Sequence, residues 1–528
     1  MAEQFVADVV VVGLGSSGSV FAGRLAEKGG CSLAIIEHGK RQWPKVSTIP
    51  AAVFRTLGRR EYDWSFETEA DPSRGGRNEI WPRGKGPGGS SLINGTIFVR
   101  GNPKDYDAWE KLGAKGWDYR SVLPHFRSLE SWSTPDQHRG SLGPLPIEVP
   151  PFEYELSETL IAAADAAGYG RTADYNGANQ LGFGRVQANQ RRGRRINPFD
   201  VFLAPHLKSP NVRLFTGASV QRILFDGNRA VGVEMLRDGV LEKVMARRKV
   251  VVCAGAIASP ALLLRSGIGP AEDLRSLGIK IVANSPEVGH NLREHAGVMM
   301  PFRVDRPTVN ESGRPLGMAK ALLQWFAGKG PAAAATAQVV GFHHIDDPHG
   351  RADLQFHFSP FSFSADDKGR VFLPRENLLL MAPSLNHPMS SGRIGLRSRH
   401  PDAPPLIEPR LIDHPRDIAV LARGVRIVEH ILKTEPLAKH VRGFIDPPPA
   451  DDAEMESFIR ERASPIYHPV GTCRMGSDPA AVVDSSLAVN GVKGLMVVDT
   501  SILPAHISGN THAAALMIGE KAASEFVL

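Results

Sequence analysis

Cysteine is scarce in this chain of 528 residues. Its 3 cysteines, Cys31, Cys253 and Cys473, are widely separated and odd in number, which excludes a disulfide framework and a CxxC metal site. We therefore predict a protein of a reducing compartment, the cytoplasm. Long apolar runs are also missing, because none approaches the ~18 residues of a membrane-spanning helix. Residues 1–8 have neither the basic nor the apolar region of a secretory signal, so we expect no signal peptide.

Charge of one sign is in only small excess. The chain has 62 Lys and Arg against 56 Asp and Glu, a net charge of +6 at pH 7. One dense basic cluster occurs at residues 191–195. Such a cluster can favour nucleic acid or an anionic membrane, but no nucleic-acid motif accompanies it, and we interpret it as a solvated loop. His343 and His344 lack a third ligand at metal spacing, so we predict no bound metal and no nucleic-acid partner.

The first forty residues carry the strongest pattern in the chain. A valine run at 9–12 leads into a GxGxxG motif, a helical stretch follows, and a second apolar run ends on an acidic residue. In this order the glycines permit a tight turn, close approach of a pyrophosphate and close helix packing, and the acid binds ribose hydroxyls. The motif therefore predicts an adenine-dinucleotide site. The residues assigned to it are Gly13, Gly15, Ser16, Ser17, Gly18 and Glu37.

Two further strand-like runs resemble the first in composition. One spans 250–254 and precedes a helix that Pro260 begins and Gly267 ends; the other spans 495–498 and ends on Asp499. We expect these runs to join the first strand in one nucleotide-binding layer built from distant segments. Between them, Leu354, Phe356 and Phe358 alternate with polar residues, and the region 300–455 is predicted to be a mostly antiparallel sheet with one helix.

Three additional motifs narrow the prediction. They are the Gly-rich segment 83–95, the strand-to-helix unit extended through 255–269, and the segment 467–476 with Asn510-Thr511-His512 downstream. Together with the opening motif they resemble the glucose–methanol–choline (GMC) family of oxidoreductases, from about residue 8 to the end of the chain. The resemblance implies an α/β fold: a Rossmann-like FAD-binding domain from residues 1–150, 212–300 and 456–528, and an α+β substrate domain on an antiparallel sheet from residues 151–211 and 301–455.

The resemblance also implies the cofactor, FAD, and further residues that contact it. Ile93 stands where some relatives have a histidine that bonds covalently to the flavin, so we predict non-covalent FAD. The implied contacts lie in the Gly-rich segment, on the strand near residue 220, and near the end of the chain. They are Arg83, Gly88, Gly89, Ser90, Asn94, Gly95, Val220, Asp499 and Ala513.

Alcohol oxidation by hydride transfer requires a base for the hydroxyl proton and a donor that holds the developing oxyanion. A histidine with a pKa near neutrality suits the first task, and His468 matches the family's catalytic histidine. The register of the terminal helix assigns the second task to His512, with Asn510 as the rival. Ile466 and Tyr467 flank the base and are expected to shape the pocket, together with Phe356 and Phe358. His290 and His295 lie in a segment similar to the family's, and we interpret them as structural.

The predicted function is FAD-dependent oxidation of a primary alcohol to its aldehyde, with hydride transfer to flavin N5. The phenylalanine-rich strand favours an aryl, heteroaryl or medium aliphatic alcohol. A choline-type dehydrogenase or oxidase, and a hydroxynitrile lyase on the same fold, stay open as alternatives. Oxygen or a quinone-like or dye-like acceptor could take up the electrons. The sequence does not fix the oligomeric state.

Overall fold

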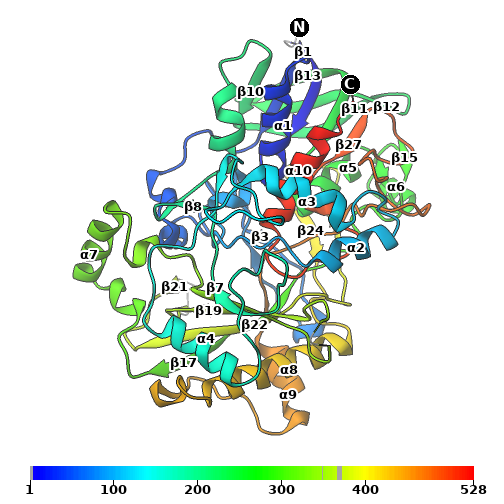
Figure 1. Ribbon diagram of the computed structural model, residues 1–528. Helices are drawn as coiled ribbons and strands as arrows, with labels where there is room; N and C mark the ends of the chain where they lie inside the picture. Colours follow the sequence, from blue (N-terminus) through cyan, green and yellow to red (C-terminus); the bar gives the residue numbers. More distant parts are fainter. Residues whose placement is uncertain (1–3, 348, 366–370, 528) are drawn as a thin grey trace.

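The computed structural model describes residues 4–347, 349–365 and 371–527. Two large sheets organise the chain, and each is covered by helices. Figure 1 shows the first sheet with α1 and α10 at the top, near both termini, and the second sheet below it, above α8 and α9. The fold class is α/β, as predicted.

The first sheet is built from both ends of the chain. Its strand order is β10 (Val212–Thr216), β2 (Leu33–Glu37), β1 (Gln4–Val12), β13 (Val240–Val252), β12 (Arg229–Arg237) and β11 (Ala218–Asp226), and β27 (Leu495–Val497) also pairs with β13. Strands β10, β2, β1, β13 and β27 run parallel, whereas β12 and β11 are antiparallel. The continuous apolar runs are buried because helices cover both faces of such a sheet. The prediction of one layer from distant segments is confirmed.

Helices α1 (Ser16–Lys28) and α10 (His512–Ser524) lie side by side against this sheet (Figure 1). Gly519 fits against the backbone of Ser17, where a Cβ would come within 2.4 Å of the carbonyl oxygen. An ion pair of 2.8 Å also joins Arg24 Nε to Glu520 Oε2. α5 (Gly255–Arg265) follows β13 and begins close to Asp499. The first and last helices of the chain therefore form one wall.

The second sheet is antiparallel, as predicted. Its order is β25 (Val441–Phe444), β17 (Met300–Val304), β22 (Leu378–Leu385), β19 (Leu354–Ser359), β18 (Val339–His343) and β7 (Gly182–Arg185). β16 (Ala296–Val298) pairs with β22 and β26 (Ala463–Pro465). These last two strands fall inside the ranges 212–300 and 456–528 that we assigned to the other domain. The domain boundaries themselves stay a prediction.

The apolar face of this sheet packs on helices. α8 (Pro415–Leu432), α9 (Asp452–Arg462) and α4 (Leu156–Ala166) contribute to one buried cluster with the sheet. The remaining helices are α2 (Pro103–Lys111), α3 (Tyr119–Leu129), α6 (Ala271–Ser276) and α7 (Pro315–Phe326). The short strands are β3 (Phe66–Glu67), β4 (Ile80–Trp81), β5 (Glu130–Ser131), β6 (Leu145–Pro146), β8 (Gln190–Arg191), β9 (Arg194–Arg195), β14 (Ile268–Gly269), β15 (Ala283–Asn284), β20 (Ser364–Ala365), β21 (Val371–Phe372), β23 (Arg393–Leu396) and β24 (Pro405–Glu408).

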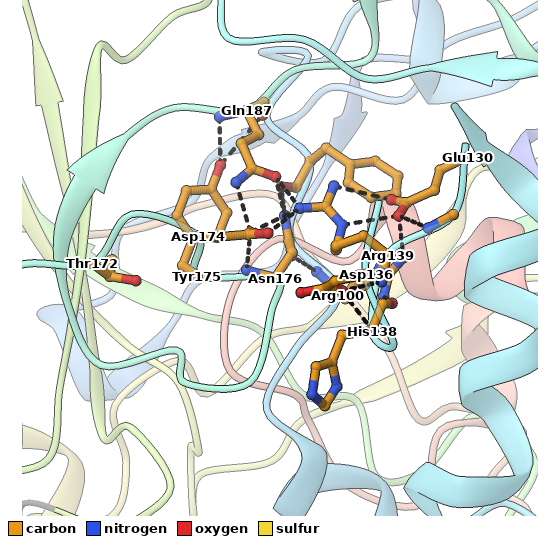
Figure 2. A network of polar contacts seen from close by, with 12 residues as sticks. Arg100, Glu130, Asp136, His138, Arg139, Thr172, Asp174, Tyr175, Asn176 and Gln187 are labelled. Carbon is orange, nitrogen blue, oxygen red and sulfur yellow. Dashed lines mark hydrogen bonds and ion pairs between the residues drawn. The ribbon is translucent and has the colours of Figure 1, made fainter. Parts of the chain in front are cut away.

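A buried polar network ties the connecting segments together (Figure 2). Arg139 donates from Nε to Glu130 Oε1 at 2.8 Å and from Nη1 to Asp174 at 2.7 Å. Arg100 pairs with the same Glu130 carboxylate, and Gln187 Nε2 donates to Asp174 Oδ1. Glu130 and Arg139 are fully buried. Charges removed from water in this way require their partners, so the network fixes how these loops meet.

In the part of the chain that the structure describes, no helix combines the length and the apolar composition needed to cross a membrane.

Candidate active site

The GxGxxG motif forms the turn between β1 and α1. Gly13 has φ +97°, and a Cβ there would lie 2.6 Å from the carbonyl oxygen of Cys253. At Gly18 a Cβ would lie 2.2 Å from the carbonyl oxygen of Gly13. Gly15 precedes α1, and no side chain caps the helix there. The free N–H groups of the first turn and the helix dipole favour an anion at this point.

The second Gly-rich segment lies directly against this turn. Gly88 N donates to Leu14 O at 2.6 Å, and a Cβ on Gly89 would lie 2.7 Å from Gly15 Cα. Gly88 and Gly89 both have positive φ. A Cβ on Gly89 would fill the space between the two loops, whereas a Cβ on Gly88 would meet the side chain of Asn197. The two segments therefore form one cradle with an accessible backbone.

A buried guanidinium lies beside the cradle. Arg195 donates to Ser47 O, Ser91 O and Asn94 Oδ1, which are uncharged acceptors. Burial lowers the pKa of Arg195 to about 9. Arg195 departs from the solvated loop predicted for residues 191–195, because it is buried while Arg191, Arg192 and Arg194 are exposed. A buried cation among neutral partners fits an anionic group of a ligand.

The structure places His512 at the cradle and not beside His468. Its Nδ1 lies 3.0 Å from Ser16 Oγ, and its buried Nε2 has no hydrogen-bond partner. Burial lowers the pKa of His512 to about 4, with a smaller effect from Arg195. α10 begins at His512 without a side-chain cap. The N-termini of α1 and α10 and the Arg195 guanidinium thus converge on one region.

Other predicted cofactor residues hold the cradle in shape. Glu37 is buried at the end of β2 and accepts from Leu14 N and Gly39 N at 2.9 and 2.8 Å. Burial raises the pKa of Glu37. Asp499 accepts from Gly255 N, Ser259 Oγ and Ser501 N, so it joins α5 to the end of β27.

His468 lies between the two sheets, and polar groups hold both of its ring nitrogens. Asn510 Nδ2 lies 3.1 Å from His468 Nε2, and His295 Nδ1 lies 3.0 Å from His468 Nδ1. Gln355 Nε2 donates to Asn510 Oδ1 at 3.0 Å, so the amide group of Asn510 faces the imidazole. Contrary to the register expectation, the side chain beside His468 Nε2 is that of the rival, Asn510, which precedes α10 and contacts Gln355 of the second sheet.

His295 determines which nitrogen of His468 carries the proton. His295 Nε2 lies 3.0 and 3.1 Å from the carbonyl oxygens of Asn386 and Ile507, which only accept, so this nitrogen is the donor. Burial lowers the pKa of His295 well below its ordinary value, so its Nδ1 is an unprotonated acceptor. His468 must then donate from Nδ1 and keep the lone pair on Nε2. The sequence predicts a structural role for His295 and does not indicate its contact with His468.

The imidazole of His468 is held neutral by its surroundings. Burial is the main cause that lowers the pKa of His468 well below its ordinary value, and the neighbouring His295, His357 and Arg83 act in the same direction. The backbone N–H of His468 donates to Glu294 Oε1 at 2.6 Å. Burial raises the pKa of Glu294 to about 8. An imidazole with an unprotonated Nε2 next to an amide donor is suited to accept a proton from a hydroxyl group.

Family models identify the chain at this point. Residues 7–297 match a model described as GMC oxidoreductase, and residues 388–519 match a second model with the same description. The chain belongs to the GMC oxidoreductases. The resemblance inferred from the motifs is confirmed, and the chain is an FAD-dependent oxidoreductase that acts on CH–OH donors.

Relatives of this GMC oxidoreductase cover almost its whole length. An oxygen-dependent choline dehydrogenase of Brucella anthropi is 37% identical over 99% of this chain and 95% of its own length. An uncharacterised GMC-type oxidoreductase of Mycobacterium tuberculosis is 38% identical over 98% of each chain. Among solved structures, pyridoxine 4-oxidase from Mesorbium loti has a TM-score of 0.90 at 29% identity, over 98% of this chain and 99% of its own.

The residues present fit FAD. A Cβ on Gly89 would fill the space between the two glycine loops. Among the residues that the structure describes, the buried Arg195 has only neutral partners and His512 Nε2 has none. A dinucleotide pyrophosphate matches the first two features. In this GMC oxidoreductase, Ile93 is buried and cannot form a covalent bond to a flavin, so non-covalent binding stays our prediction.

The structure also locates the predicted pocket residues. Ile466 and Tyr467 adjoin His468, and Arg83 Nη1 donates to Tyr467 O at 2.9 Å. Phe356 and Phe358 instead belong to the apolar cluster with α8, so their placement at the pocket is corrected. Alternate residues of a strand face opposite sides. Gln355, which precedes Phe356 in β19, contacts Asn510. The face of β19 that carries Gln355 is therefore the face toward the site.

The remaining predicted contacts have these positions. Ser90 Oγ accepts from Gly84 N, and Gly95 lies against Thr336. Val220 is on β11, opposite Met235. Ser17 and Ala513 are buried near the starts of α1 and α10. Their contacts to the cofactor stay predictions.

Proposed function

We propose that this protein oxidises a primary alcohol to the aldehyde, with His468 as the general base and Asn510 as the oxyanion donor. The observation that carries the proposal is the orientation of His468. Its Nδ1 side is held by His295 and its Nε2 faces the amide of Asn510. A proton acceptor and a hydrogen-bond donor are thus presented to the same oxygen atom of a substrate.

The residues act on the substrate hydroxyl in sequence. His468 Nε2 accepts the proton, and the resulting imidazolium keeps its Nδ1–H bond to His295. Asn510 Nδ2 donates to the alkoxide oxygen, and Gln355 holds the amide in this orientation. When bound, FAD supplies the acceptor for the hydride that leaves the substrate carbon. As the carbon–oxygen double bond forms, the aldehyde is released and the proton stays on His468.

The proposed substrate is an aryl, heteroaryl or medium aliphatic primary alcohol. The similarity to pyridoxine 4-oxidase, at 29% identity over nearly the whole chain, supports a heteroaryl alcohol. The phenylalanine-rich strand no longer supports it, because Phe356 and Phe358 are in the core. Choline is the second candidate, since the Brucella relative at 37% identity is a choline dehydrogenase.

A substrate panel tests the proposal. The holoenzyme is mixed anaerobically with benzyl alcohol, pyridoxine, hexanol or choline, and flavin absorbance is followed. Bleaching by one of the first three, with formation of the aldehyde, supports the proposal. Bleaching by choline alone supports the second candidate. Persistent flavin colour together with cyanohydrin cleavage would identify a lyase and refute both. Parallel assays for hydrogen peroxide and for dye reduction then identify the class of electron acceptor.

A further inference from the structure

Helix α7 exposes an unusual number of large apolar side chains. Leu316 is 87% exposed, Leu323 is 72% exposed and Phe326 is 66% exposed. Met318 and Leu322 are exposed on the same helix. The opposite side is packed, because Ala321 and Trp325 are buried with the segment that follows α7. Apolar residues gathered in this way on one surface helix are typical of an interaction site and not of a solvated surface.

The basic cluster at 191–195 lies beside this helix. It forms the tight hairpin of β8 and β9, in which Arg191, Arg192 and Arg194 are exposed. The Arg194 guanidinium lies 4.0 Å from the centroid of the Trp325 ring, and Trp325 Nε1 donates to Gly193 O at 2.8 Å. Two segments that are 120 residues or more apart in sequence thus form one surface.

The charged side chains on and just after α7 are positive. Lys320 on α7 and Lys329 just after it are exposed, and α7 contains no acidic residue. Of the nearby acids, Glu148 accepts from the backbone of residues 192 and 193, and Glu311 precedes the helix. Two lysines therefore accompany the exposed apolar side chains of α7, and the hairpin with its three exposed arginines packs against the same helix at Trp325.

We propose that α7 and the β8–β9 hairpin form a docking surface for an anionic lipid bilayer. A helix with Leu and Phe on its exposed face and Lys and Arg around it lies in the plane of a membrane interface, with its apolar side chains among the acyl chains. Each cation near an anionic surface strengthens binding roughly fivefold. A second copy of the chain fits less well, because a two-fold contact would bring each cationic patch onto the same patch of its partner.

The segment that follows α7 contacts the Gly-rich segment 83–95. After α7, the segment Pro331–Ala333 packs near residues 50–55, and Thr336 lies against Gly95. Figure 1 shows α7 at the left edge of the molecule, apart from α8 and α9. Docking through α7 would therefore hold this side of the molecule near the membrane and leave the rest of the protein in water.

Co-sedimentation with lipid vesicles tests the proposal on the FAD-loaded protein. We expect sedimentation with vesicles of equal parts phosphatidylglycerol and phosphatidylcholine, weak sedimentation with phosphatidylcholine alone, and a loss of binding at high salt. Leu323→Glu combined with Phe326→Glu should weaken binding by at least tenfold. The matched control is Leu142→Glu, because Leu142 is 98% exposed and belongs to neither α7 nor the hairpin. Lys329→Glu should weaken binding at least fivefold, and Lys115→Glu, at another exposed lysine, should not.

Flavin content and far-UV circular dichroism verify that each variant is folded. Wild-type protein that stays in the supernatant with anionic vesicles would overturn the proposal. Equal binding to neutral vesicles, or equal weakening by Leu142→Glu, would do the same. Light scattering tests whether a second copy of the chain covers α7 instead. If the wild type is a dimer that does not bind vesicles, and the Leu323/Phe326 double substitution makes it monomeric, α7 forms a contact between two copies.

Discussion

Replacement of His295 by leucine tests whether this residue orients the catalytic base. In the wild type, His295 Nδ1 accepts from His468 Nδ1 at 3.0 Å, while its Nε2 donates to two backbone carbonyl oxygens. Leucine has a similar bulk but cannot accept a hydrogen bond. Without the acceptor, the His468 ring can rotate or change tautomer, and the Nε2 lone pair is no longer fixed toward Asn510.

The size of the effect follows from the single bond that is lost. A typical net contribution of about 0.5–1.5 kcal/mol for such a hydrogen bond corresponds to a roughly 2- to 13-fold slower reduction of the flavin. Replacement of the base itself, His468→Ala, should cost roughly 10²- to 10⁴-fold. Because His295 is proposed to act only through His468, adding His295→Leu to His468→Ala should slow the reaction no further.

Anaerobic stopped-flow measurement of flavin reduction provides the rate constants for the wild type, both single variants and the double variant. Each is compared at saturating alcohol, with flavin content as the control for folding. The limiting rate constant should fall, while the half-saturating alcohol concentration stays within about twofold of the wild type. Additive effects in the double variant, or a His295→Leu variant as fast as the wild type, would refute the orientation argument.

Four further outcomes are expected. Asn510→Ala should slow flavin reduction roughly 10²- to 10³-fold, as expected for loss of an oxyanion donor. If stopped-flow measurements show that His512→Ala slows the reaction as much as Asn510→Ala, Asn510 is not distinguished from His512 as the oxyanion donor. His512→Ala should instead weaken retention of FAD on gel filtration, because the bond to Ser16 Oγ is lost. Because the pKa of His468 is lowered, its imidazole stays neutral as the pH falls through 6.5. The rate of flavin reduction should therefore begin to fall only below pH 6.5. A fall in rate that begins above pH 6.5 would contradict the assignment of His468 as the base. Arg139→Leu should reduce the free energy of unfolding, measured with urea, by about 3–5 kcal/mol, because the buried Glu130 loses a partner. A reduction of less than about 1 kcal/mol would contradict this prediction.

Local patterns predicted the elements better than the meeting of distant side chains. The valine run, the glycines and Glu37 fix β1, the turn and β2, because each step depends on neighbours in sequence. The choice between Asn510 and His512 depends on where a loop points just before α10, and helix register alone cannot decide it. The contact of His295 with His468 joins two residues outside the strands, one just before β16 and one after β26, that are 173 positions apart in the sequence.

Two other misplacements have equally specific causes. The alternation along β19 predicts two faces but does not say which face meets the cofactor side, and the aromatic residues are on the other one. The cluster at 191–195 looks uniform in sequence, yet the hairpin turns Arg195 inward and leaves its neighbours exposed. Charge patterning could not separate them, since all four arginines have the same side chain.

The pairing of α1 with α10 has a consequence for the order of events during synthesis. The GxGxxG turn is synthesised first, but the cradle also includes the start of α10 at His512. Ser16 contacts that histidine across 496 positions of the chain. A nascent chain therefore carries an incomplete cradle until almost the last residue has left the ribosome. Loading of the flavin can follow only after release, so a chain that ends before α10 should be colourless even where its first strands are correctly formed.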